Sequence, residues 1–85
     1  MTQCEKTLQS VLRGTSDANI DFQELHALLN ALGFKERIRG DHHIYSRENL
    51  AEIINIQPKG AMAKAYQVKQ IRNLIVKYRL GEDLK

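Results

Sequence analysis

Apolar residues recur at helical spacing in three parts of the chain, at residues 4–13, 21–32 and 66–78. Recurrence at i, i+3, i+4 and i+7 marks the buried side of an amphipathic helix. The stripe positions are Cys4, Thr7, Leu8, Val11 and Leu12, then Phe22, Leu25, Leu28, Leu29 and Leu32, and finally Val68, Ile71, Leu74, Ile75 and Tyr78. We therefore predict three helices that share one core.

Turn-forming residues set the ends of these helices. Gly14 stops the first helix and opens a linker over residues 14–19. Asp21 is suited to cap the second helix, with Glu24 three residues later, and Gly33 ends it. Because the first helix is short, it has to dock on the rest of the fold to persist.

Three short segments between the second and third helices have the composition of strands. They are residues 34–39, 42–46 and 52–57, joined first by a turn at Gly40-Asp41 and ended by Pro58. The order predicts an α+β fold, in which helices cover one face of a small three-stranded antiparallel sheet and an extra helix precedes this unit. The other face of the sheet is expected to be open.

Side chains alternate between the two faces of a strand, which assigns the strand residues to faces. Apolar residues of the first and third strands, such as Ile38 and Ile54, hold even positions, so we place even positions under the helices. His42 would then pack beside Ile44. The open face would carry the odd positions Lys35, Arg37, Arg39, His43 and Tyr45, with Arg47 beyond them. The turn at Gly40-Asp41 could break this parity between strands.

The net charge of +3 conceals a bias along the chain. Residues 34–79 hold ten basic and four acidic side chains, hence +6, whereas residues 1–33 carry −2. A basic surface favours a polyanion such as RNA as partner, and the alternative is an ordinary solvated surface.

Eighty-five residues, 42% of them apolar, suit one globular domain.

The chain carries no signal for export or membrane insertion. No apolar run approaches the roughly 20 residues of a membrane span, and the polar start is followed by no secretory apolar region. The single cysteine, Cys4, cannot form an internal disulfide, which fits a reducing compartment. A cytoplasmic location is expected.

His43 is the strongest candidate for chemistry. An imidazole within a basic patch can take a proton from a ribose 2′-hydroxyl or give one to a leaving oxygen, and the alternative is an ordinary exposed histidine. Lys59 and Lys64 flank the start of the last helix and either hold a phosphate or belong to a flexible charged loop. His26 is expected to be solvated on the outside of its helix.

No cofactor is expected. Cys4 and the two adjacent histidines match no zinc spacing, and the chain contains neither a P-loop nor a dinucleotide-binding glycine motif.

Two stretches resemble HicA-type toxins of bacterial toxin–antitoxin systems. They are residues 21–34 (DFQELHALLNALGF) and residues 39–45 (RGDHHIY), within a similarity that spans about residues 20–78. The strongest motif is Gly-x-His-His followed by an apolar residue, placed after a leucine-striped helix. The family often has a small hydroxyl residue where this chain has Asp41, and a carboxylate there would repel phosphate.

The resemblance implies a double-stranded-RNA-binding-domain-like fold over residues 20–80, an N-terminal extension over residues 1–19 and a short polar tail over residues 81–85. It implies an mRNA-cleaving endoribonuclease, independent of metal, whose catalytic histidine is the second of the pair, His43. The expected partners are mRNA and a HicB-type antitoxin. From the strand pattern and the charges, we expect RNA contacts at Lys35, Arg37, Arg39, Tyr45, Lys59 and Lys64.

Two other functions remain open. A non-catalytic RNA-binding module of the same fold would need shape and phosphate contacts but no general acid. A protein–protein module would use the basic face for an acidic partner and would show no salt-dependent affinity for RNA.

Overall fold

The computed structural model describes residues 2–83. Three helices and one sheet follow one another as α1 (Gln3–Arg13), α2 (Phe22–Ala31), β1 (Lys35–Arg39), β2 (His42–Ser46), β3 (Ile54–Ile56) and α3 (Ala65–Tyr78). Short 3-10 helices at Asp17–Asn19 and Leu80–Asp83 complete the order. The α+β class, the α-β-β-β-α order of the main unit and the additional N-terminal helix are thus confirmed.

Side-chain caps begin the first two helices. The Thr2 hydroxyl accepts a hydrogen bond from the Glu5 backbone N–H at 3.2 Å, and an Asp21 carboxylate oxygen accepts one from the Glu24 N–H at 3.1 Å. Each satisfies a backbone donor that the helix itself leaves unpaired. At the other end of α2, Gly33 adopts a φ of 94°, a conformation that favours glycine.

The sheet has the order β1-β2-β3 and both of its pairings are antiparallel. Gly40 and Asp41 alone connect β1 to β2, so that Arg39 pairs with His42. Gly40 has a φ of 61°, whereas Asp41 has no positive φ, as in type II′ turns with glycine first. This turn sets the register of the whole hairpin.

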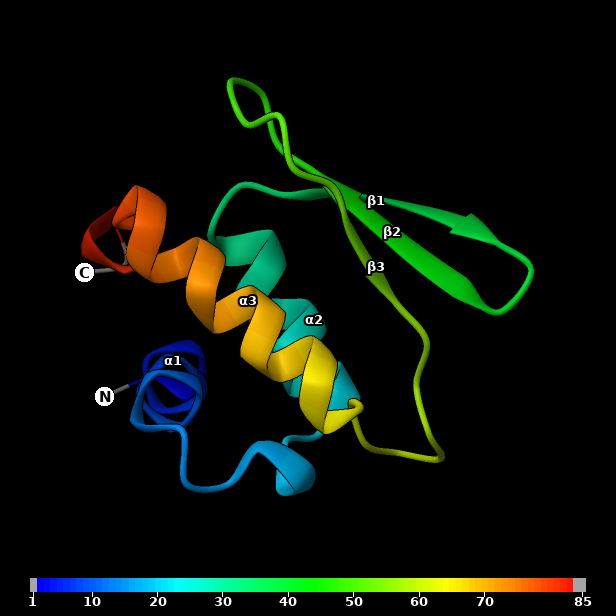
Figure 1. The fold of residues 1–85 in the computed structure, drawn as a ribbon, viewed down its shortest axis with the longest axis horizontal. Helices are drawn as coiled ribbons and strands as arrows, with labels where there is room; N and C mark the ends of the chain where they lie inside the picture. Colours follow the sequence, from blue (N-terminus) through cyan, green and yellow to red (C-terminus); the bar gives the residue numbers. More distant parts are fainter. Residues whose placement is uncertain (1, 84–85) are drawn as a thin grey trace.

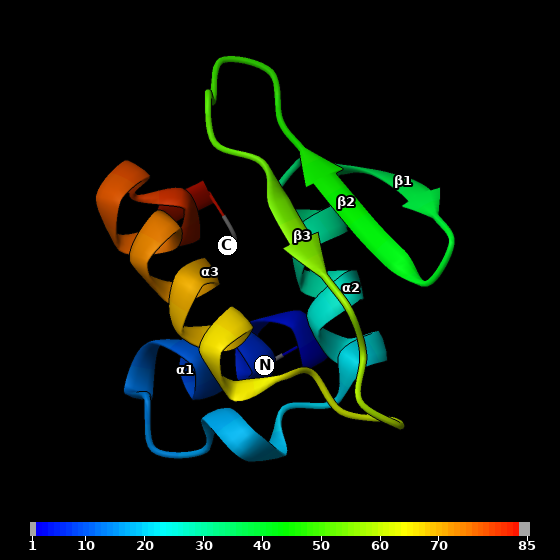
Figure 2. The same cartoon turned by 45° about the vertical axis from the view of Figure 1, so that its right-hand side comes forward.

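The helices lie together on one side of the sheet, and the turn end of the β1–β2 hairpin projects beyond them (Figures 1 and 2). The core between the layers includes Leu25 and Leu28 of α2, Ile56 of β3 and Ile71 of α3, none of which has exposed surface. α1 contacts both α2 and α3 and adds Leu8 and Val11 to this core. The predicted N-terminal extension is therefore docked on the main unit.

Three details differ from the sequence-based expectation. Leu12, expected on the buried stripe of α1, is 42% exposed. The third strand is Ile54–Ile56, shorter than residues 52–57, and the Glu52 carboxylate before it accepts hydrogen bonds from the Tyr78 hydroxyl and the Lys77 ammonium. The predicted tail begins inside the last 3-10 helix, and residues 84 and 85 lie outside the described residues.

Over residues 2–83, no helix is both long and apolar enough to cross a membrane.

Two valines of α3 allow a matched test of this packing. Val68 has no exposed surface, whereas Val76 is 63% exposed. We expect Val68→Ala to lower the free energy of unfolding by about 2 kcal/mol, because it removes buried methyl groups and leaves a cavity. Val76→Ala should change it by less than about 0.5 kcal/mol. Urea denaturation followed by circular dichroism measures both, and equal effects would contradict this packing of α3.

Candidate functional site

The hairpin register places His43 and Tyr45 on the helix-covered face of the sheet. Directly paired residues share a face, and the pairs are Ile38 with His43 and Glu36 with Tyr45. The predicted parity gives the right face for β1 and β3 but is wrong for β2. Ile38, expected under the helices, is nevertheless 62% exposed, because the hairpin end projects beyond them. A two-residue turn pairs each odd position with an even one, so the inward set of β2 is its odd set.

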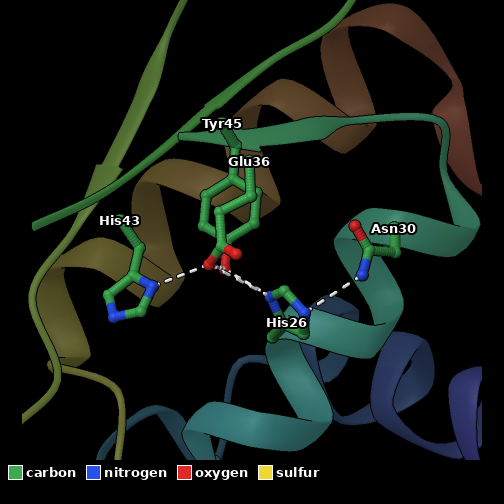
Figure 3. Close-up of polar contacts among 5 residues, drawn as sticks. All are labelled: His26, Asn30, Glu36, His43 and Tyr45. Atoms are coloured by element: carbon green, nitrogen blue, oxygen red, sulfur yellow. Dashed lines mark hydrogen bonds and ion pairs between the residues drawn. The ribbon is translucent and has the colours of Figure 1, made fainter. Parts of the chain in front are cut away.

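The Glu36 carboxylate is the centre of a polar cluster under the sheet (Figure 3). Its Oε2 atom lies 2.6 Å from Nδ1 of His43 and 3.1 Å from the Tyr45 hydroxyl. Nδ1 of His26, on α2, lies 3.4 Å from the same oxygen. Three side chains, two from β2 and one from α2, therefore converge on one carboxylate of β1.

Hydrogen bonding and burial shift the pKa values of the two acids in the cluster in opposite directions. The hydrogen bond from His43 lowers the pKa of Glu36, with a further contribution from the Tyr45 hydroxyl, while partial burial opposes them. Burial of Tyr45, together with its hydrogen bond to Glu36, raises the pKa of its phenol strongly. At neutral pH the cluster therefore contains a carboxylate and a neutral phenol.

These charge states define the donors and acceptors. Because a carboxylate only accepts, Nδ1 of His43 carries the proton that it shares with Glu36, and the Tyr45 hydroxyl donates to the same carboxylate. His26 then donates from Nδ1 to the Tyr45 oxygen at 2.7 Å, while its Nε2 accepts from the Asn30 amide at 3.1 Å. Each of the five side chains in this hydrogen-bonded network is therefore tied to at least one other member.

The orientation of His43 leaves one of its ring nitrogens available. With Nδ1 held by Glu36, Nε2 points away from the cluster (Figure 3), and residues 2–83 offer it no hydrogen-bond partner. The ring stands edge-on to Phe22 at the start of α2, with 4.8 Å between centroids, and the side chain keeps 22% of its surface exposed. A histidine oriented by a carboxylate, with the second nitrogen open, is suited to proton transfer.

The other predicted site residues lie at three different places. Lys35, Arg37 and Arg39 are exposed on the open face, as expected. The prediction that Tyr45 contacts RNA directly is wrong, because Tyr45 lies on the helix-covered face and has no exposed surface. Lys59 is exposed in the loop after β3, and Lys64 is half-buried just before α3.

His42 occupies the open face together with Ile44, not the core. Its side chain is 46% exposed, and its Nδ1 lies 3.0 Å from the Asn55 side-chain oxygen. Asp41 accepts a hydrogen bond of 2.6 Å from the Gln57 amide, which lowers the pKa of the Asp41 carboxyl. Gln57 in turn accepts a hydrogen bond from Lys64 at 3.3 Å. Asp41 thus links the hairpin turn to the segment before α3. The carboxylate that contacts His43 is Glu36 and not Asp41.

Sequence reasoning missed Glu36, and it wrongly left His26 solvated. One available signal was the lone acidic residue, at an even position that faces inward, in a strand whose other charged residues are all basic. Another was the four-residue spacing of His26 and Asn30, which puts both on one side of α2. Both signals become informative only once the hairpin register places Tyr45 inward.

No protein-family model matches the chain, and no match to it was found among the curated proteins or the solved structures. Within residues 2–83, no group of three or more histidine, cysteine or acidic side chains is placed to hold a metal ion.

The lowered pKa of Glu36 predicts a pH dependence of stability. A carboxyl whose pKa is lower in the folded state stabilises the fold fully above its unfolded pKa of about 4.3, and this contribution is lost as pH falls through the folded value. Urea unfolding of the wild type from pH 7 to pH 3 should therefore show a decrease in the free energy of unfolding at acidic pH. Glu36→Gln should reduce this decrease. Glu48→Gln, at an exposed position after β2, is the control. The same decrease in unfolding free energy at low pH in the wild type and in Glu36→Gln would contradict a stabilising role of the Glu36 carboxylate.

Proposed function

We propose that this chain is an endoribonuclease that cleaves mRNA, of the kind found in HicA-type toxins, with His43 as general base. The observation that carries the proposal is the His43–Glu36 pair, in which Nδ1 is held at 2.6 Å and Nε2 is open. This is the histidine that the family resemblance implies. The carboxylate beside it gives that histidine a fixed tautomer and orientation.

The chemistry follows from this orientation. Nε2 of His43 takes the proton of a ribose 2′-hydroxyl, whose oxygen attacks the adjacent phosphorus. The bond from phosphorus to the 5′-oxygen breaks, and that oxygen leaves with a proton from water. The products are a 2′,3′-cyclic phosphate and a free 5′-hydroxyl. The resulting imidazolium is stabilised by the negative charge of Glu36 through Nδ1–H.

Basic side chains near the hairpin end support binding of the phosphate backbone. Arg39 follows Ile38, the cross-strand partner of His43, and lies next to the turn. Lys59 is in the loop after β3, the strand whose Ile56 pairs with His43 from the other side. Lys35 and Arg37 extend the charge along β1. Cations at this density favour a polyanion over an uncharged ligand.

The remaining parts of the proposal rest on the resemblance. One is neutralisation by a HicB-type antitoxin; the other is a cytoplasmic location, which the single cysteine, Cys4, also favours. An acidic antitoxin surface would complement the exposed basic side chains of β1, and such complementarity mainly speeds association.

The adjacent histidines provide a matched test of catalysis. We expect His43→Ala to reduce cleavage of a single-stranded RNA by about 100-fold or more, because it removes the proton acceptor. His42→Ala, on the opposite face, should change the rate by less than about 3-fold. Both rates are measured on purified protein, and growth and transcript integrity are followed after induction in bacteria. Binding of RNA without cleavage by the wild type would favour the non-catalytic module, and absence of salt-dependent binding would favour a protein partner.

Glu36→Gln separates the orienting carboxylate from the base itself. The amide keeps the shape of the side chain but cannot stabilise the imidazolium, so we expect the cleavage rate to fall by about 10-fold or more. The dissociation constant for RNA should change by less than about 3-fold. Single-turnover kinetics with excess protein distinguish the two quantities. An unchanged rate would show that His43 needs no carboxylate partner.

A further inference from the structure

A second feature of the molecule is a hollow of about 840 Å³ between the loop after β3 and the start of α3. It lies outside the Glu36 cluster. Lys59, Lys64 and Tyr66 line it together with Gln57, and its lining within the described chain includes no acidic side chain. A hollow with this lining attracts an anionic ligand.

Tyr66 differs from the other aromatic residues of the chain. It is 65% exposed, whereas the remaining four are buried or half-buried. The ring lies between the first hollow and a second one of about 490 Å³, since it lines both. A flat apolar ring is therefore presented to solvent between two concave surfaces.

A buried amide holds this ring in place. Nε2 of Gln67 lies 3.4 Å from the Tyr66 hydroxyl and 3.3 Å from the Asn55 backbone oxygen. Gln67 itself is only 3% exposed, so its position is fixed by packing. Tying the hydroxyl to a fixed donor restricts the ring before any ligand arrives, which lowers the entropic cost of stacking on it.

Positive charge continues on both sides of the ring. Lys59 and Lys64 line the first hollow, and Lys69 lines the second together with Glu52 and Lys77. None of these three ammonium groups forms an ion pair with an acidic side chain of residues 2–83, unlike Lys77, which pairs with Glu52 at 2.9 Å. An exposed aromatic ring between cations that form no ion pair is the arrangement that binds single-stranded nucleic acid, with bases stacked and phosphates neutralised.

We propose that Tyr66 is a stacking platform for one unpaired base of the RNA strand, with Lys59, Lys64 and Lys69 holding the flanking phosphates. The choice of RNA as ligand rests on the proposed function. Gln57, which lines the hollow, directly follows Ile56, the cross-strand partner of His43. The proposed stacking site therefore adjoins the end of β3 that lies beside His43. An acidic peptide would use the lysines but has no base to stack on the ring.

The test measures binding without cleavage. The wild-type chain and its variants are titrated against a fluorescein-labelled 2′-O-methyl oligouridine, which cannot supply the attacking oxygen. We expect Tyr66→Ala to weaken binding by about 10-fold and Tyr66→Phe by less than about 3-fold, because phenylalanine keeps the stacking face. Val76→Ala, at an equally exposed apolar position on α3, should leave the affinity unchanged. A duplex RNA should respond less than about 2-fold to Tyr66→Ala, because its bases are already stacked.

The outcomes separate this inference from the nuclease proposal. Equal binding by the wild type and Tyr66→Ala overturns the stacking platform, even if the wild type cleaves RNA. Loss of binding in Tyr66→Ala, retained in Tyr66→Phe, supports the platform even if the wild type does not cleave. Equal weakening in both variants assigns the effect to the hydroxyl and overturns stacking. No binding to RNA at low salt overturns both proposals.

Discussion

The two-residue connection between β1 and β2 is the constraint on which the site depends. With only Gly40 and Asp41 between the strands, Arg39 must pair with His42, and every later pair follows. Glu36 and Tyr45 become direct neighbours, and His43 lies two pairs closer to the turn on the same face. A connection longer by one residue would turn His43 and Tyr45 to the open face and leave the carboxylate without them. The turn therefore determines the chemistry as well as the register.

The same register brings polar groups into a small core, where each needs a partner. A phenol and a carboxylate lose hydration when they are buried, and that loss costs free energy unless hydrogen bonds replace the water. Tyr45 and Glu36 satisfy one another, and His26 and Asn30 extend the chain of partners to the surface of α2. A network with every member paired is rigid, since no member can turn without breaking a bond. That rigidity keeps Nδ1 of His43 directed at the carboxylate.

Most of the fold follows from local patterns in the sequence, and the site does not. The stripe of α2, the cap at Asp21 and the strand at residues 42–46 are each determined by a few neighbouring residues, and the structure confirms them. The placement of His43 depends on a relation between two strands, and alternation within each strand leaves that relation open. The role of Glu36 depends in addition on the height of α2 over the sheet, which brings His26 to the same oxygen. No pattern within one segment contains this information.

The arrangement separates the proposed chemistry from most of the charge. His43 lies under the sheet, whereas Lys35, Arg37 and Arg39 project from the other face. The two faces come closest to one another at the hairpin turn, which projects beyond the helices (Figure 2). Only the sheet itself separates them there. On the other flank, the loop after β3 brings Lys59 and the hollow beside Tyr66 towards the same end of the sheet. An RNA strand bound as proposed would therefore have to bend around this end of the sheet to contact both sets of side chains.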